Sequence, residues 1–369
     1  MNNMTRDLSW KAVSWIARVF ISFWIALIFF HSPGVNGYWP AEYHDMVTGK
    51  AYRPFVTRAL MPWTIRTVVA ATPEKAKTAI AEGLEHSWYV NKELHWKPYY
   101  YEYLVGYLLS VFCLVAFSLV CRSFWRSFLT PPHPYGEMFS IVALLGLPLL
   151  FKYYSYIYDF PTLFLYTLCL LLLARRNWVM YFPVFFLSCV NKETAILLPV
   201  VFALYYIVHH RDDRHIYWLF LTGQVVLAVL VRGGIAFLYR DNPGSALESH
   251  FLYHNLPLLT VPPSVETSVT WLLLITVVLH QWWTKPWLLR VAVSMLVPLL
   301  SLCLFFGSLD ELRDYYEVYA PALMLGAISF LRLLGYPIRT LTPSTPSSVG
   351  RIRAAADAPP EDPDGISVS

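Results

Sequence analysis

Charged side chains of both signs gather in four short stretches of this 369-residue chain. A carboxylate can take a proton from an attacking hydroxyl group, and arginine or lysine can stabilise the charge that develops on a departing oxygen. Together these residue types suit acid–base chemistry and the binding of an anionic group. The residues that we single out are Glu42, His44, Asp45, Arg53, Arg58, Asp159, Lys192, Glu193, Arg313 and Glu317.

The first of these stretches contains two arginines that could face one anion. Residues 52–58 carry Arg53 and Arg58, and Pro54 stiffens the chain between them. A guanidinium group presents a planar fork that suits phosphate. The alternative is a membrane-surface helix whose arginines reach lipid headgroups. The acidic residues and histidine at positions 42–45 would, taken alone, also fit a solvated loop.

The other three stretches lie at the borders of apolar runs. Asp159 begins such a run with no nearby cation after it, and burying it unpaired would cost several kcal/mol, so we expect a partner from another segment. Lys192 and Glu193 could bind substrate or simply pair with each other. Arg313 and Glu317 are four residues apart, so the alternative for them is an ordinary ion pair on one helix.

Metal and thiol chemistry have little support in the sequence. His250 and His254 are four residues apart, but no third ligand is evident, so we interpret them as loop residues. A divalent cation is left open as a cofactor. The five cysteines lie in or beside apolar runs without a CxxC pair, which favours buried thiols over a redox or zinc site. They are Cys113, Cys121, Cys169, Cys189 and Cys303.

The composition indicates a membrane protein. Hydrophobic residues make up 57% of the chain and charged residues only 14%, against about a quarter charged in soluble proteins. The apolar residues form blocks that approach the ~20 residues of a spanning helix. The predicted spans are 12–31, 100–121, 137–151, 160–174, 177–190, 195–210, 216–238, 270–284, 289–307 and 320–335. The fold class is therefore an all-α polytopic membrane protein, with one transmembrane domain over 1–335.

The distribution of basic residues predicts the orientation. Cytoplasmic loops carry an excess of Lys and Arg, which places both termini in the cytoplasm and the 32–98 loop outside. Residues 54–71 of that loop have helical spacing, and Thr72 and Pro73 are typical of the start of a further helix. The charges at 191–194 favour a break between two helices over one long span. Arg232, near the outer end of its span, must face a cavity, a headgroup or a carboxylate.

The net charge of +4 is small and lies at the predicted membrane borders, so we expect no nucleic-acid partner. Residues 336–369 are rich in Pro, Ser, Asp and Ala without apolar periodicity, which predicts a disordered cytoplasmic tail.

Three stretches resemble those of a known superfamily. They are YRPFVTRALMPW at 52–63, YDFPTLF at 158–164 and NKETA at 191–195. With one anchor, a large outer loop that contains surface helices and many short spans, the chain resembles the GT-C membrane glycosyltransferases, such as protein O-mannosyltransferases and bacterial membrane proteins of this kind. The resemblance covers roughly residues 12–335 and rests on layout more than on a strict motif.

The resemblance implies a sugar transfer from a polyprenyl-phosphate donor outside the bacterial inner membrane. A carboxylate of the first outer loop would be the catalytic base, so the candidates are Asp45 and Glu42, which stand three apart where the family's strongest form has an adjacent acidic pair. The other singled-out residues would bind substrate: Arg53 and Arg58, with Lys192 or Arg313, would hold the lipid phosphate, and Asp159 and Glu193 would orient the acceptor or a cation. His44 and Glu317 complete the binding set.

Two other functions fit the same charges. A transporter or flippase could line a passage for a lipid-linked or anionic solute with them, although no internal repeat and no midplane cluster is evident. A membrane subunit without chemistry of its own could use them as assembly contacts. The enzyme is the function that we carry forward from the sequence.

Overall fold

Helices and turns make up the part of the chain that can be described. The computed structural model describes all residues except 1–2, 130–134, 209–213, 248, 263 and 337–369. These described residues contain no β-strand beyond an isolated bridge between Arg53 and Gly244. The all-α prediction is confirmed. The predicted disorder of the 336–369 tail falls, from position 337 onward, outside the described residues.

Several helices are long and apolar enough to cross a membrane, which is consistent with the membrane protein that the composition predicts. Among the described residues, four helical runs have the length and composition of a span, and one bent pair makes up to five. The four are α1 (Asn3–Phe29), α6 (Tyr100–Phe128), α11 (Arg214–Leu238) and the run of α14 (Trp287–Ser294) with α15 (Leu296–Phe306), and the bent pair contains α12 (Leu256–Thr260) and α13 (Val265–Leu279).

The remaining predicted spans also coincide with helices, but these are shorter. Four apolar helical runs have only 10–17 residues, below the ~20 that a perpendicular crossing needs. Hydropathy therefore located the helices correctly, whereas length alone does not make each of them a span. The shorter helices are α7 (Tyr135–Leu145), α8 (Asp159–Ala174), α9 (Trp178–Asn191) and α10 (Leu197–Phe202), and α16 (Tyr316–Leu333) closes the bundle.

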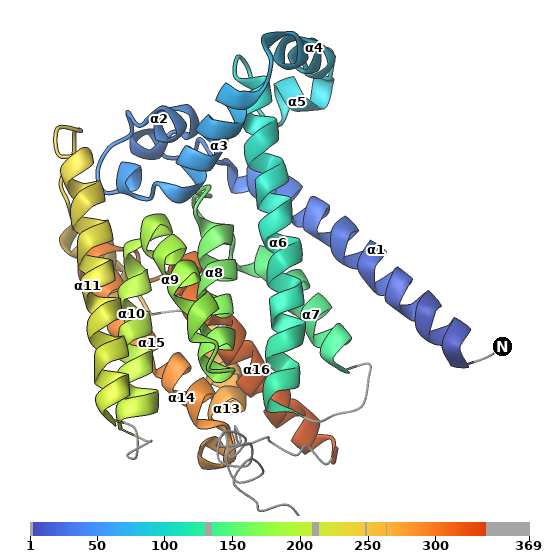
Figure 1. Cartoon of the computed structure of the whole chain (residues 1–369), viewed down its shortest axis with the longest axis vertical. Helices are drawn as coiled ribbons and strands as arrows, with labels where there is room; N and C mark the ends of the chain where they lie inside the picture. The colour runs from blue at the N-terminus through green and yellow to red at the C-terminus, as the bar shows by residue number, and fades with distance from the viewer. Residues whose placement is uncertain (1–2, 130–134, 209–213, 248, 263, 337–369) are drawn as a thin grey trace, which may run out of the picture.

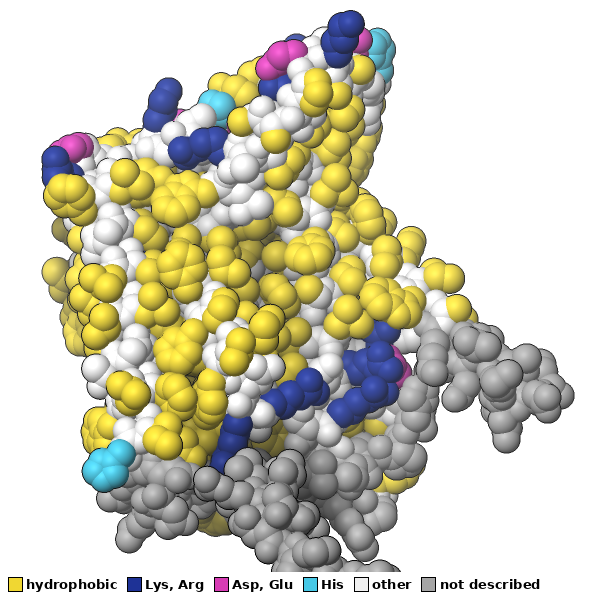
Figure 2. All heavy atoms as spheres, in the orientation of Figure 1, with side chains coloured by type: hydrophobic (Ala, Val, Ile, Leu, Met, Phe, Trp, Pro, Cys, Tyr) yellow, Lys and Arg dark blue, Asp and Glu magenta, His cyan; other side chains and the backbone are white. Residues whose placement is uncertain are grey.

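The core of the bundle lies around α8. This helix packs against α6, α9 and α16, and Leu163, Leu170 and Leu173 on it are fully buried. A helix that is apolar on all sides is expected in such a central position. The helix α11 lies at the periphery (Figure 1) and exposes Leu230 and Phe237. Figure 2 shows hydrophobic side chains covering the middle of one face, with Lys and Arg above and below them.

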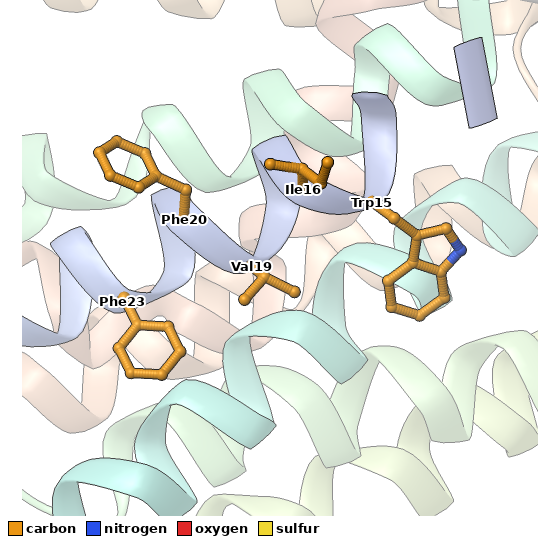
Figure 3. Close-up of a pocket in the computed structure, with 5 residues that line it drawn as sticks. All are labelled: Trp15, Ile16, Val19, Phe20 and Phe23. Atoms are coloured by element: carbon orange, nitrogen blue, oxygen red, sulfur yellow. The ribbon is translucent and has the colours of Figure 1, made fainter. Parts of the chain in front are cut away.

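The first helix diverges from the bundle. In Figure 1, the N-terminal half of α1 points away from α6 and α7, against which the rest of α1 packs. Apolar side chains line a hollow of about 420 Å³ along it (Figure 3): Trp15, Ile16, Val19, Phe20 and Phe23. Such a surface is stable in contact with hydrocarbon, which fits the span predicted over 12–31.

Short helices between α1 and α6 form a cap over one end of the bundle (Figure 1). We use the name cap for residues 39–92, which contain the 3₁₀ turns η2 (Trp39–Ala41) and η3 (Phe55–Thr57) and the helices α2 (Tyr43–Thr48), α3 (Leu60–Ala71), α4 (Glu74–Glu85) and α5 (Trp88–Lys92). The helix predicted over 54–71 begins only at Leu60.

The predicted start of the next helix was wrong by one position. Thr72 ends α3, because its hydroxyl donates to the Val68 carbonyl, and Pro73, with ψ 141°, is the N-cap of α4. Thr72 is extended, with ψ 130°, as expected of a residue before proline, and Pro73 is the residue that directly precedes α4.

The predicted break between 177 and 210 is confirmed. The helix α9 ends at Asn191, Lys192 is extended with φ −151° and ψ 146°, and a 3₁₀ turn, η5 (Glu193–Ile196), leads into α10. The charged residues at this break lie at the cap end of the bundle and belong to the site described next.

Candidate functional site

Charged side chains from five separate segments meet beneath the cap. They come from the segment after η3, the start of α8, the α9–α10 break, α11 and the segment that leads into α16 (Figure 1). We call this set the central ion network. Its members are Arg58, Asp159, Lys192, Glu193, Arg232, Glu311, Arg313, Asp314 and Glu317.

Two arginines share one carboxylate at the more accessible side of this network. Arg58 Nη2 lies 2.5 Å from Glu193 Oε1, and Arg232 Nη2 lies 3.6 Å from Glu193 Oε2. The Glu193 side chain is 41% exposed. Desolvation alone would raise the pKa of Glu193, but Arg58 and then Arg232 outweigh it and lower that pKa to about 2. Glu193 is therefore ionised at neutral pH, and the group of three carries net positive charge.

Arg58 and Arg232 are both held by further contacts. The Arg58 guanidinium lies 4.4 Å from the centroid of the Tyr158 ring and donates to the Tyr158 hydroxyl. Arg232 donates to the Thr57 carbonyl at 3.0 Å and to the Cys189 carbonyl at 3.3 Å. Arg232 thus joins the cap, α9 and α11. Of the three environments expected from the sequence, a cavity, a headgroup or a carboxylate, it faces a carboxylate.

Asp159 has the partner that its position demanded. Arg313 Nη1 lies 3.4 Å from Asp159 Oδ2, while Arg313 Nη2 lies 2.5 Å from Glu311 Oε1. The Arg313 guanidinium also lies 4.0 Å from the centroid of the Tyr156 ring. Asp159 and Arg313 are both buried, so each neutralises a charge whose unpaired burial would be costly. The expectation of a partner from another segment is confirmed.

Lys192 and Glu193 do not pair with each other. Lys192 Nζ lies 3.5 Å from Glu317 Oε1, and the Thr194 hydroxyl donates to the same carboxylate. The extended backbone at Lys192 sends successive side chains to opposite sides, so Lys192 points into the core while Glu193 faces Arg58. Both local pairs offered as alternatives in the sequence analysis are therefore absent, Lys192 with Glu193 and Arg313 with Glu317.

The pairing between Arg313 and Glu317 fails for a reason of backbone geometry. The spacing assumed one helix through both residues, but α16 begins at Tyr316, and Arg313 lies in a 3₁₀ turn, η9 (Leu312–Tyr315). Such a turn has about three residues per turn instead of 3.6. The two side chains consequently face different partners.

A second ionic contact, which the sequence analysis missed, lies next to this network. Asp310 accepts from Lys152 at 2.8 Å and from the Tyr153 hydroxyl, and it lies 2.9 Å from His254 Nε2. Burial would raise the pKa of Asp310, but hydrogen bonds from His254, Lys152 and Tyr153 lower it to about 2. His254, interpreted as a loop residue, lies in a short π-helical turn, η7 (Phe251–Asn255). The only sequence signal was the charge of Asp310 beside the 311–317 stretch.

The candidates from the first loop lie apart from the central ion network. His44 Nδ1 lies 3.2 Å from Glu102, and its ring stacks on Tyr99 at 3.5 Å. Glu42 is exposed and Asp45 is half-buried, and neither forms an ion pair with any side chain that the structure describes.

Arg53 occupies yet another place in the cap. Its Nη2 donates to the Gly244 carbonyl at 2.7 Å. Together with Trp39, Tyr52 and Phe55 it lines an aromatic hollow of about 310 Å³. Arg53 and Arg58 therefore do not face one anion, because the turn η3 between them directs one to this hollow and the other to Glu193.

In the described part of the chain, no three His, Cys, Asp or Glu side chains are placed to hold a metal ion. The five cysteines are buried thiols, as predicted.

Comparisons with family models, with curated proteins and with solved structures give no match to this chain. The functional assignment consequently rests on the residues and their geometry.

Proposed function

We propose that this protein is a membrane glycosyltransferase that takes a sugar from a polyprenyl-phosphate donor and transfers it to an acceptor at the cap end of the bundle, on the extracytoplasmic side. In this proposal the ten predicted segments all cross or enter the membrane, and both termini lie in the cytoplasm. The resemblance to GT-C enzymes supports the reaction class, and the geometry of the central ion network supports a phosphate-linked substrate.

The observation that carries the proposal is the sharing of Glu193 by Arg58 and Arg232. Two guanidinium groups and one carboxylate leave one positive charge in excess at a partly exposed position. Arginine binds phosphate oxygens through paired hydrogen bonds, and a fixed positive charge stabilises the oxygen that leaves when the bond between sugar and phosphate breaks. The phosphate of the donor would lie against these two arginines.

The position of Arg232 also suits a donor that arrives from the lipid. The helix α11 exposes Leu230 and Phe237 on its outer side, while Arg232 reaches inward to Thr57. Gly233 and Gly234 follow Arg232, are exposed, and have open space where a side chain would stand. A polyprenyl chain along the apolar surface of α11 would bring its phosphate to the level of Arg232.

Donor binding tests the proposal directly. Purified protein in lipid nanodiscs is titrated with polyprenyl-phosphate-linked hexoses, and transfer is measured with a radiolabelled sugar. We expect Arg58→Gln and Arg232→Gln each to weaken donor binding at least tenfold, because a charge-assisted contact contributes about 1.5–3 kcal/mol. Arg240→Gln is the matched control, since Arg240 follows α11 and, among the described residues, its contacts are an ion pair with Asp241 and the ring of Phe237.

Either of two results would overturn the proposal. One is wild-type protein that binds no polyprenyl-phosphate lipid from the panel. The other is binding that is equally strong in the Arg58, Arg232 and Arg240 variants. Movement of the lipid-linked sugar across the bilayer without transfer would instead support the flippase function.

A further inference from the structure

Three arginines converge on one buried carboxylate toward the end of the bundle that lies opposite the cap. Glu137 of α7 forms ion pairs with Arg18 of α1 and with Arg122 of α6, and Arg126 Nη2 lies 3.6 Å from Glu137 Oε1. An arginine side chain stays charged in proteins, so these four side chains carry two positive charges in excess. The proposed sugar transfer uses none of them.

The cluster runs from the interior of the protein to its surface. Arg18 and Glu137 are buried, and Arg18 also donates to the Ser140 hydroxyl at 3.0 Å. By contrast, the side chain of Arg122 is 23% exposed and that of Arg126 is 50% exposed. Because Arg18 and Glu137 compensate each other in the interior, the excess positive charge lies toward the surface, on Arg122 and Arg126.

On α6 these two arginines continue a row of apolar side chains, which we call the α6 stripe. Its residues follow one another at steps of three and four, the spacing that places them on one side of a helix. They are Leu108, Phe112, Val115, Leu119, Arg122 and Arg126. All are at least partly exposed. Fourteen residues separate Leu108 from Arg122, about 21 Å along a helix, and one leaflet contributes ~15 Å to the hydrocarbon core.

The helix α1 supplies a second apolar wall. Phe23 packs against Tyr107 with 6.0 Å between the ring centroids, and the Tyr107 hydroxyl donates to the Phe23 carbonyl at 2.9 Å. From this contact toward its N-terminus, α1 diverges from α6 (Figure 1). Val19 and Trp15 follow Phe23 at four-residue steps on the same face and line the hollow in Figure 3. Figure 2 shows Lys and Arg side chains at the surface beneath hydrophobic side chains in this region.

We propose that this surface binds an anionic diacyl phospholipid, with its headgroup against Arg122 and Arg126 and its acyl chains along the α6 stripe and the facing side of α1. The apolar walls suit acyl chains, and the guanidinium fork suits a phosphate. Basic pockets between membrane helices are typical sites for anionic headgroups. The inference does not depend on the proposed sugar transfer, whose arginines lie at the cap end.

The orientation of the chain in a membrane does not by itself explain this arrangement. Retention on the cytoplasmic side requires only basic side chains near the membrane border. It does not require a buried pair, Arg18 with Glu137, that joins three helices and holds two further arginines at the end of an apolar stripe. A negatively charged headgroup would compensate the charge excess that the four side chains leave.

Lipid binding is measured by native mass spectrometry of the full chain in detergent. The protein is titrated with phosphatidylglycerol or with phosphatidylcholine that has the same acyl chains. We expect a preference for phosphatidylglycerol of roughly 25-fold, because each of two arginines near an anionic headgroup contributes about fivefold. The preference should fall to about fivefold in Arg126→Gln and disappear when Arg122→Gln is added. Arg126→Gln leaves Glu137 paired with Arg18 and Arg122, so the single variant should keep the fold.

The controls separate a lipid site from general attraction by charge. Arg332→Gln removes a basic side chain at the same end of the bundle, where Arg332 donates to Gln281 and Thr284, and it should keep the full preference. Arg126→Lys, which retains the charge, should keep most of it. Soluble glycerol phosphate, which lacks acyl chains, should not displace bound phosphatidylglycerol at the same concentration.

Four results would overturn the proposal. The first is equal binding of the two lipids by the wild type, and the second is an unchanged preference in the double variant. The third is an equal reduction in Arg332→Gln and Arg126→Gln, which would indicate general attraction by charge. The last is displacement of phosphatidylglycerol by glycerol phosphate, which would indicate a site for free phosphate without a role for the apolar walls.

Discussion

Arg313 forms ion pairs with two buried carboxylates from different parts of the chain. It contacts Asp159 at the start of α8 and Glu311 in the segment before α16. The side chains of Asp159 and Arg313 are only 1% and 5% exposed. At such burial, removal of one partner leaves the other charge without compensation, and this cost exceeds the net value of the pair itself.

We therefore expect Arg313→Met to lower the free energy of unfolding by about 3–5 kcal/mol. The measurement is thermal unfolding of the detergent-solubilised protein. In the double variant with Asp159→Asn, one uncompensated charge is gone, so part of the loss should be recovered. An unchanged unfolding temperature in Arg313→Met would contradict the buried contact.

At the level of single residues, the sequence shows which buried charges require a partner more reliably than it shows which residue that partner is. The apolar run after Asp159 was enough to demand a cation from elsewhere. The identity of that cation depends on how α8 and α16 pack, which hydropathy does not encode. Asp314 was visible only as one charge in an acidic stretch, since its place in the central ion network depends on the folded chain.

Among the elements, the contact between α2 and α6 fixes the cap on the bundle. Tyr43 is fully buried, donates to the Glu102 carbonyl at 2.9 Å and stacks on Tyr103 at 4.3 Å. A Cβ at Gly106 would overlap the Tyr43 hydroxyl. The glycine is thus required by close approach of a side chain from the cap.

Gly106→Ala should consequently detach the cap and destabilise the protein by about 1–3 kcal/mol, the usual cost of overpacking. Limited proteolysis within residues 39–92, together with the unfolding temperature, reports both effects. Gly83→Ala is the control, because Gly83 lies in α4 with open space around it and alanine there should favour the helix by up to about 1 kcal/mol. Equal behaviour of the two variants would argue against the contact.

Element positions were largely predictable, and element ends were not. Apolar blocks located the helices of the bundle because hydropathy depends on composition alone. The start of α16 at Tyr316 and of α4 at Glu74 follows from local backbone geometry. The start of α16 leaves Arg313 in the turn before that helix, and this decides which carboxylates Arg313 meets.

For the whole molecule, the question that can be tested is which end of the bundle faces the cytoplasm. The cap lies at one end (Figure 1), and Arg126, Arg175 and Arg332 lie in or just after the last turns of α6, α8 and α16 at the other. Basic residues are retained on the cytoplasmic side of membranes, so in the proposed orientation this end of the bundle faces the cytoplasm.

We expect a membrane-impermeant maleimide to label Lys50→Cys, in the cap, from outside intact cells. Thr284→Cys, beyond α13 at the opposite end, should react only after permeabilisation. Both positions are exposed, and the native cysteines are buried, which keeps the background low. Labelling of both variants from the same side would contradict the orientation.

The sharing of Glu193 by Arg58 and Arg232 has a consequence for selectivity. The Glu193 carboxylate already occupies the position that an incoming anion would take. Because it belongs to the same chain, its effective concentration at that position is high. A ligand gains only the difference between its attraction to the arginines and that of Glu193. Neutral glycolipids and weakly charged solutes gain almost nothing from this exchange, whereas a phosphate, with more charge and more acceptor oxygens than a carboxylate, still gains. A lipid would thus bind at this position only if its headgroup attracts the two arginines more strongly than Glu193 does.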